Sequence, residues 1–216
     1  MQVVPIETGP FDCNVFLLTE GSTSFLIDTG VGIGTQKIEK GVKKALSGNK
    51  LDGILLTHEH LDHAGGIGHL SEAFSADVYS SPETASVLER GDEDLTGASL
   101  FGLEVRPFRG IVPISGDLTV NDLDLEVHST PGHSPGSICI IEKGSRALFC
   151  GDLLFCDGGI GRWDLPGGDL NVLKRSVKSA LEWDIKGLYP GHGRIERAHP
   201  DREMRFSASM LFNDGL

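Results

Sequence analysis

The chain contains the stretch Thr57-His58-Glu59-His60-Leu61-Asp62-His63-Ala64-Gly65-Gly66. Three histidines and one aspartate fall within six residues, directly after the apolar run Ile54-Leu55-Leu56. One four-coordinate zinc ion needs three protein ligands and an open position, so four donors in one loop favour two neighbouring ions. Imidazole and carboxylate donors without thiolates favour Zn, Fe or Mn over a closed structural zinc site.

Three more potential metal ligands follow short apolar runs farther along the chain. Each stands directly after a glycine, in the segments Pro131-Gly132-His133, Gly151-Asp152 and Pro190-Gly191-His192. Glycine lets the backbone turn tightly at the end of a strand, where loops commonly carry functional groups. The candidate ligands are therefore His58, His60, Asp62, His63, His133, Asp152 and His192.

A non-metal explanation of the first loop is unfavourable, because three imidazoles packed with a carboxylate would repel one another when protonated. The remaining histidines, His69, His128 and His199, are isolated in the sequence. We expect these three at the surface or hydrogen bonded in the core.

The apolar patterning predicts strands and helices in both halves of the chain. Strands are predicted at 22–28, 54–56, 77–80, 137–142, 146–150 and 187–189, with a hairpin at 118–127 that turns at Asn121-Asp122. Helices are predicted at 34–48, 64–74, 82–90, 170–183 and 202–212, and 91–99 is predicted to be a loop. The pattern indicates two similar halves packed sheet to sheet, with helices outside.

Composition narrows the class of protein further. The 216 residues suit a single domain, and the net charge of −12 argues against nucleic acid or an anionic membrane surface as a partner. No apolar run approaches a membrane span, and residues 1–11 show no signal-peptide pattern, so we expect a cytoplasmic protein. The four cysteines form no C-x-x-C pair, and Cys139 and Cys150 are expected in the core.

Taken together, Thr57-His-x-His-x-Asp-His63, Pro131-Gly-His133, Gly151-Asp152 and Pro190-Gly-His192 resemble the motifs of the metallo-β-lactamase superfamily. The resemblance implies an α+β fold, an αβ/βα four-layer sandwich of two sheets flanked by helices, formed by residues 1–216 as one domain. It also implies a dinuclear site at one edge of the sandwich. His58, His60 and His133 would hold the first ion, Asp62, His63 and His192 the second, and Asp152 would bridge them. Asp28, which matches an acid at the end of an early strand, and Thr57 would orient the ligands.

Details of the motifs indicate a branch of the superfamily. Asp152 stands where the lactamases carry Cys or Ser, which argues against β-lactamase activity. His60 stands where flavodiiron proteins carry a carboxylate, which argues against membership of that redox branch. The segment Gly158–Asp169 resembles the Gly-x-Gly-Arg-x-Asp stretch of hydroxyacylglutathione hydrolases (the glyoxalase II type), which persulfide dioxygenases share. In that stretch, Arg162 and Asp164 are expected to form an ion pair near the site. Only 193–216 follow His192, so we expect no separate helical glutathione-binding domain, and another thiol carrier stays open.

The resemblance implies hydrolysis of a small-molecule thioester by a hydroxide bound to two Zn²⁺ ions, or to a mixture of Zn, Fe and Mn. Asp62 and Asp152 would take part in catalysis through the metal ions. One alternative is a persulfide dioxygenase with one Fe²⁺ held by His58, His133 and Asp152. Lactone hydrolysis and a non-catalytic metal-binding or interaction protein are further alternatives. The exact substrate, the native metal and the oligomeric state stay open.

Overall fold

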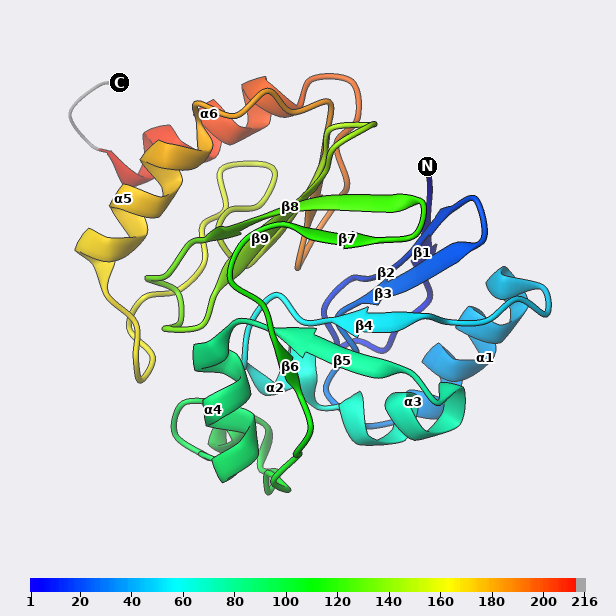
Figure 1. Ribbon diagram of the computed structural model, residues 1–216. Helices are drawn as coiled ribbons and strands as arrows, with labels where there is room; N and C mark the ends of the chain where they lie inside the picture. Colours follow the sequence, from blue (N-terminus) through cyan, green and yellow to red (C-terminus); the bar gives the residue numbers. More distant parts are fainter. Residues whose placement is uncertain (213–216) are drawn as a thin grey trace.

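The structure, a computed structural model, describes residues 1–212 and contains two β-sheets that pack face to face (Figure 1). The first sheet has the strand order β1-β2-β3-β4-β5-β6 and the second has the order β11-β10-β9-β8-β7. The strands of the first sheet are β1 (Gln2–Ile6), β2 (Val15–Glu20), β3 (Thr23–Ile27), β4 (Gly53–Leu55), β5 (Asp77–Ser80) and β6 (Val112–Pro113). Those of the second are β7 (Leu118–Val120), β8 (Leu123–Ser129), β9 (Ile138–Glu142), β10 (Ala147–Gly151) and β11 (Gly187–Pro190).

Helices cover the outer face of each sheet. On the first sheet they are α1 (Thr35–Leu46), α2 (Leu61–Ala64), α3 (Ile67–Phe74) and α4 (Pro82–Arg90), and a short 3₁₀ helix, η1, follows at Ala98–Phe101. On the second sheet they are α5 (Leu170–Ala180) and α6 (Pro200–Leu211). The predicted αβ/βα four-layer sandwich is therefore confirmed.

Three apolar cores hold the layers together. One lies between the first sheet and its helices, a second between the second sheet and α5 and α6, and a third between the two sheets. The third core includes the stacked rings of Phe149 and Tyr189, with Phe16 edge-on to Tyr189. Strands such as β3, β9 and β10 are buried at every residue, because a layer covers each of their faces.

The local pattern predicted most elements but not every boundary. The predicted helix 64–74 starts three residues too early, since α2 ends at Ala64 and the observed helix, α3, spans Ile67–Phe74. Gly65 and Gly66 break it by packing against the backbone carbonyls of Val31 and Thr29, where a Cβ atom would collide. The predicted loop 91–99 ends two residues too late, because η1 begins at Ala98. The sequence interpretation also missed the hairpin that β1 and β2 form.

All four cysteines are buried and free of disulfides. Cys139 and Cys150 lie in the core beneath α5 and α6, as expected. Within residues 1–212, no helix has the length and apolar character needed to cross a membrane.

Candidate metal centre

The candidate ligands gather at one edge of the sandwich because the strands that carry them end there. Strand β4 leads into the loop with His58, β8 leads to His133, and β10 and β11 end just before Asp152 and His192. Since β10 and β11 are parallel neighbours, their carboxyl ends meet, and Gly191 N donates a hydrogen bond to Gly151 O at 2.8 Å. The chain order therefore delivers donors from both sheets to one place.

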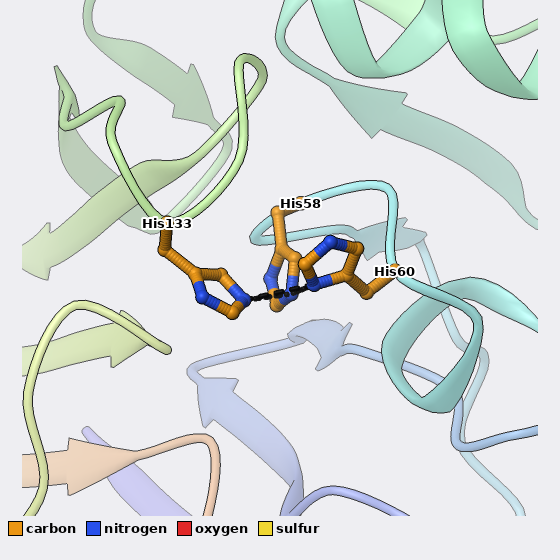
Figure 2. A group of neighbouring side chains, drawn as sticks. All are labelled: His58, His60 and His133. Carbon is orange, nitrogen blue, oxygen red and sulfur yellow. Dashed lines mark hydrogen bonds between the residues drawn. The ribbon is translucent and has the colours of Figure 1, made fainter. Parts of the chain in front are cut away.

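Three imidazoles form a tight group, the three-histidine cluster, which consists of His58, His60 and His133 (Figure 2). His58 Nε2 lies 3.2 Å from His60 Nδ1, His60 Nδ1 lies 2.8 Å from His133 Nε2, and the two Nε2 atoms are 3.3 Å apart. Nitrogens bound at about 2.0–2.1 Å around a tetrahedral zinc are separated by roughly 3.3 Å. The cluster thus has the dimensions of one face of a zinc site.

Hydrogen bonds fix the tautomers of two of these rings. The Thr57 hydroxyl donates to Asp28 Oδ2 at 2.8 Å, so its oxygen accepts from His58 Nδ1 at 3.1 Å. His133 Nδ1 donates to the carbonyl oxygen of Arg162 at 2.7 Å. With their protons on Nδ1, both rings direct an Nε2 lone pair into the cluster. A proton on His60 Nδ1 could make a good hydrogen bond with only one of these two lone pairs. A cation between the three rings would interact with both.

A second group, the Asp62 cluster, consists of Asp62, His63 and His192. Asp62 Oδ2 lies 3.1 Å from His192 Nε2 and 3.9 Å from His63 Nε2, and the two Nε2 atoms are 3.4 Å apart. His63 Nδ1 lies 2.8 Å from Asp28 Oδ2, which places its second nitrogen toward the cluster. Asp28 therefore supports one ring directly and, through Thr57, one ring of the three-histidine cluster.

Asp152 lies between the two clusters. Its Oδ2 is 3.6 Å from both His133 Nε2 and His192 Nε2, and its Oδ1 is 3.2 Å from His63 Nε2. Oδ1 is buried and accepts no hydrogen bond from the residues described, as is also true of His60 Nε2. A buried carboxylate oxygen without a partner is costly, and a cation between the clusters would satisfy it.

The two clusters differ in their electrostatics. Burial and the neighbouring imidazoles lower the pKa of His58 well below its ordinary value and that of His60 to about 3. Burial opposes protonation of His192, but the hydrogen bond that its ring donates to Asp62 and the charge of Asp152 raise its pKa. Burial likewise opposes ionisation of Asp152, yet the neighbouring histidines, His63 first, hold its pKa below the usual range. Metal binding requires neutral imidazoles beside an ionised carboxylate. His58 and His60 already favour the neutral form, whereas nearby carboxylates raise the pKa of His63 and of His192, so these two rings must release a proton when a cation binds.

Two residues that the sequence interpretation missed hold the ligand loops in place. Glu59 stands between His58 and His60 in the sequence, and its side chain is buried. It accepts hydrogen bonds from Thr84 Oγ1 at 2.8 Å and from Gly136 N at 3.1 Å. Burial raises the pKa of Glu59. Because Gly136 belongs to the loop that carries His133, Glu59 ties together the loops of the two sheets.

Asn14 is the second missed residue. Its Nδ2 donates to the carbonyl oxygens of Pro190 at 3.0 Å and Gly193 at 2.9 Å, on either side of His192. The preceding residue, Cys13, donates its backbone N–H to Asp62 O at 3.2 Å. The only sequence signal for these contacts was a polar residue directly before an apolar strand.

Other predicted residues fall around the site or away from it. Arg162 and Asp164 form a two-pronged ion pair, with N–O distances of 2.9 and 2.8 Å, at the exposed rim. The backbone carbonyl of Arg162, not its guanidinium, is what contacts His133. The three isolated histidines lie elsewhere: His69 pairs with Glu39, His128 stacks on Trp183, and His199 precedes α6.

A cavity of about 280 Å³ opens above the two clusters. His60, Asp62, His133, Asp152 and His192 line its floor. The remaining lining residues are mostly apolar, and they are Thr96, Gly97, Leu100, Phe101, Phe155, Ile160, Arg162 and Leu165. A polar floor beneath apolar walls is typical of a small-molecule site.

Residues 8–192 match the sequence profile of the Metallo-beta-lactamase superfamily, and this range contains every candidate ligand. The chain belongs to the metallo-beta-lactamase superfamily. It is 37% identical to a probable metallo-hydrolase of Methanocaldococcus jannaschii, covering 94% of this chain and 95% of that one. It is also 31% identical to the hydroxyacylglutathione hydrolase GloC of Haemophilus influenzae, covering 93% of this chain and 96% of that one.

Solved structures agree with this membership. The B3 metallo-beta-lactamase BLEG-1 superposes with a TM-score of 0.80 at 30% identity, covering 90% of this chain and 93% of that one. A protein crystallised in a di-iron-bound form superposes with a TM-score of 0.76 at 32% identity, covering 90% and 94%. Two of these relatives are named as hydrolases and one was solved with bound iron, and the fold and the histidine-rich edge of this chain suit a metal-dependent member of the superfamily.

Proposed function

We propose that this chain is a metal-dependent hydrolase that cleaves thioesters. In this proposal the three-histidine cluster holds one divalent cation, the Asp62 cluster holds a second, and Asp152 bridges them. The observation that carries the proposal is the buried, unpaired Asp152 oxygen between two groups of converging imidazole nitrogens, at the floor of a cavity. Zn²⁺ suits the donor set, and mixed Zn, Fe and Mn occupancy suits it as well.

The chain's own side chains then have defined tasks. When bound, a pair of divalent cations lowers the pKa of a coordinated water and polarises a carbonyl oxygen. Asp28 and Thr57 keep His58 and His63 in the tautomers that leave Nε2 unprotonated. The walls of the cavity above the floor are mainly apolar. A thiolate leaves without a dedicated general acid, which is compatible with these mainly apolar walls.

The choice of a thioester has two supports. The relative named hydroxyacylglutathione hydrolase aligns over nearly all of both chains. The loop with Arg162, which resembles that family in sequence, supplies the carbonyl oxygen that accepts a hydrogen bond from His133, and it lines the cavity.

A persulfide dioxygenase with one Fe²⁺ is the second candidate. The similar protein solved in a di-iron-bound form favours iron as an occupant of this kind of site. In this alternative His58, His133 and Asp152 would form a two-histidine, one-carboxylate face, the geometry of many non-haem iron oxygenases.

The deciding experiment is metal analysis of protein purified without added metal, combined with an activity panel. The panel contains a thioester, a lactone, glutathione persulfide with an oxygen electrode, and a chromogenic β-lactam. About two metal ions per chain and turnover of the thioester are expected. One iron per chain with oxygen uptake would replace the proposal with the dioxygenase, and turnover of the β-lactam alone would also contradict it.

His60→Ala tests the ligand assignment. We expect the variant to lose one metal ion and at least about 100-fold in thioester turnover, because an open site loses one of its three protein ligands. The matched control is His69→Ala, the same change at a half-exposed histidine that pairs with Glu39. Full metal content and full turnover in His60→Ala would refute the assignment.

A further inference from the structure

The walls of the cavity carry little that could recognise a charged substrate. Above the floor, five apolar side chains from η1 and from the loop between β10 and α5 face the cavity: Leu100, Phe101, Phe155, Ile160 and Leu165. Leu100 is 58% exposed, an unusual degree for a large apolar side chain in this protein. Its exposure at the mouth leaves apolar surface available to a substrate group.

The single cationic side chain of the wall is already paired. Arg162 Nε and Nη2 donate hydrogen bonds to the two carboxylate oxygens of Asp164. The pair is exposed and neutral as a unit, and the pKa of Asp164 is lowered to about 2 by the hydrogen bond with Arg162. No second Lys or Arg lines the cavity among residues 1–212.

An acidic turn precedes this part of the wall. Thr96 and Gly97 line the cavity, and Asp92, Glu93 and Asp94 stand two to four residues before Thr96. None of the three lines the cavity, and the carboxylate of Asp92 is paired with Arg90 Nη2 at 3.3 Å. The Thr96 hydroxyl donates to the carbonyl oxygen of Asp92 at 2.8 Å, which keeps this acidic turn beside the mouth. An anionic substrate group at this wall would lose its hydration without gaining a cation.

We propose that the cavity selects thioesters whose thiol portion is uncharged and apolar, and that it discriminates against glutathione, which carries two carboxylates. This inference rests on the proposed thioester hydrolysis and adds the chemical class of the group beside the sulfur. Each methylene that moves from water to the wall is worth about a fourfold gain in affinity. Apolar thiols are therefore favoured up to the length that fills the cavity.

The first test compares thioesters of one acyl group on three thiols: ethanethiol, butanethiol and glutathione. The metal-loaded protein is expected to show at least a tenfold higher kcat/KM for the butanethiol ester than for the glutathione ester. The ethanethiol ester is expected between them. Equal or higher kcat/KM for the glutathione ester would overturn the inference.

A pair of variants tests the wall itself. Leu100→Lys places a cation at the cavity mouth, and Ile33→Lys places the same charge at a residue of equal exposure, 59%, that does not line the cavity. We expect Leu100→Lys to raise the ratio of kcat/KM for glutathione over butanethiol esters at least about tenfold at low salt, and less at high salt. Ile33→Lys is expected to stay within twofold of the unchanged protein. Equal effects of the two substitutions would overturn the inference.

A binding measurement separates this inference from the proposed function. The shift in Tm of the metal-loaded protein is measured with butyl methyl sulfide and with S-methylglutathione, two thioethers that have no free thiol to bind the metal ions and are not turned over. A larger shift with the butyl thioether than with S-methylglutathione, and the opposite order in Leu100→Lys, supports the apolar wall even where no thioester is cleaved. Absence of turnover with every thioester refutes the proposed function, whereas a larger shift with S-methylglutathione in the unchanged protein refutes the apolar wall.

Discussion

At the scale of single residues, the carboxylate of Asp28 has the widest influence on the site without reaching the cavity. It is buried and accepts from Thr57 N at 2.8 Å, from the Thr57 hydroxyl and from His63 Nδ1. Its backbone adopts φ 59°, a left-handed conformation that aspartate and asparagine tolerate better than most residues. One side chain thus orients a histidine of each cluster.

Asp28→Asn tests this double role. The amide keeps the size and the backbone conformation but offers one acceptor atom where the carboxylate offers two, so one of the His63 or Thr57 contacts is lost. We expect metal affinity to fall about 10–100-fold, the usual effect of removing a partner of a ligand. A competition titration with a coloured chelator measures it.

Asp52→Asn is the matched control, because Asp52 accepts a hydrogen bond from Ser24 N at 2.9 Å at the other end of the first sheet. Its metal affinity is expected to equal that of the unchanged protein. The assigned role of Asp28 is wrong if both variants retain full affinity.

At the scale of elements, the loop between β10 and α5 packs closely against the candidate metal centre because residue 161 is a glycine. A Cβ atom at Gly161 would collide with the carbonyl oxygen of Asp152 and would lie 3.1 Å from His133 Nδ1. The next residue supplies the carbonyl that accepts from His133. The loop can therefore approach two candidate ligands only with glycine at this position.

Gly161→Ala is expected to push the loop outward and break the hydrogen bond between His133 and Arg162. Metal content and turnover should fall together, with a loss in turnover of about tenfold or more, because His133 loses its fixed tautomer. The control is Gly68→Ala in α3, where an added Cβ meets no atom within 4 Å.

Gly68→Ala should raise the free energy of unfolding by about 0.5–1 kcal/mol, since alanine favours a helix over glycine. Its turnover should be unchanged. Urea unfolding and metal analysis of both variants check the pair, and a Gly161→Ala protein with normal metal content would show that the loop is adaptable.

Sequence reasoning could propose the candidate ligands because four of them crowd into one loop after an apolar run and the other three each follow a glycine at the end of such a run. It missed Glu59 and Asn14, since their partners lie far away: Gly136 is 77 residues from Glu59, and Pro190 is 176 residues from Asn14. Such pairs depend on how the two halves pack. The break at Gly65-Gly66 was missed for the same reason, because the opposing carbonyls belong to the loop after β3.

At the scale of the whole molecule, the metal centre joins the two halves of the sandwich. His58 and His60 follow a strand of the first sheet, and His133 follows a strand of the second. An apolar core also lies between the two sheets. In the proposed function, a bound ion would add a direct cross-link at one edge, so we expect metal binding and the stability of the fold to be coupled.

Removal of the metal with a chelator should abolish turnover and lower the Tm without unfolding the protein at room temperature. A ligand present at 1,000 times its Kd contributes about 4 kcal/mol, which for a chain of this length corresponds to roughly 10 °C. Calorimetry with and without chelator measures the shift. His60→Ala should show a smaller shift, and an unchanged Tm in the unsubstituted protein would contradict the coupling.

The buried cysteines have a practical consequence. Burial raises the pKa of Cys13 and of Cys139 to about 12 and that of Cys156 to about 11, and it raises the pKa of Cys150 well above its ordinary value. Thiolates are the reactive form, so an alkylating reagent reaches these sulfurs only when the chain opens. The rate of alkylation therefore reports the fraction of molecules in which the chain has opened. Measured with different bound metal ions, this rate compares how strongly each ion opposes opening of the sandwich, and no added label is needed.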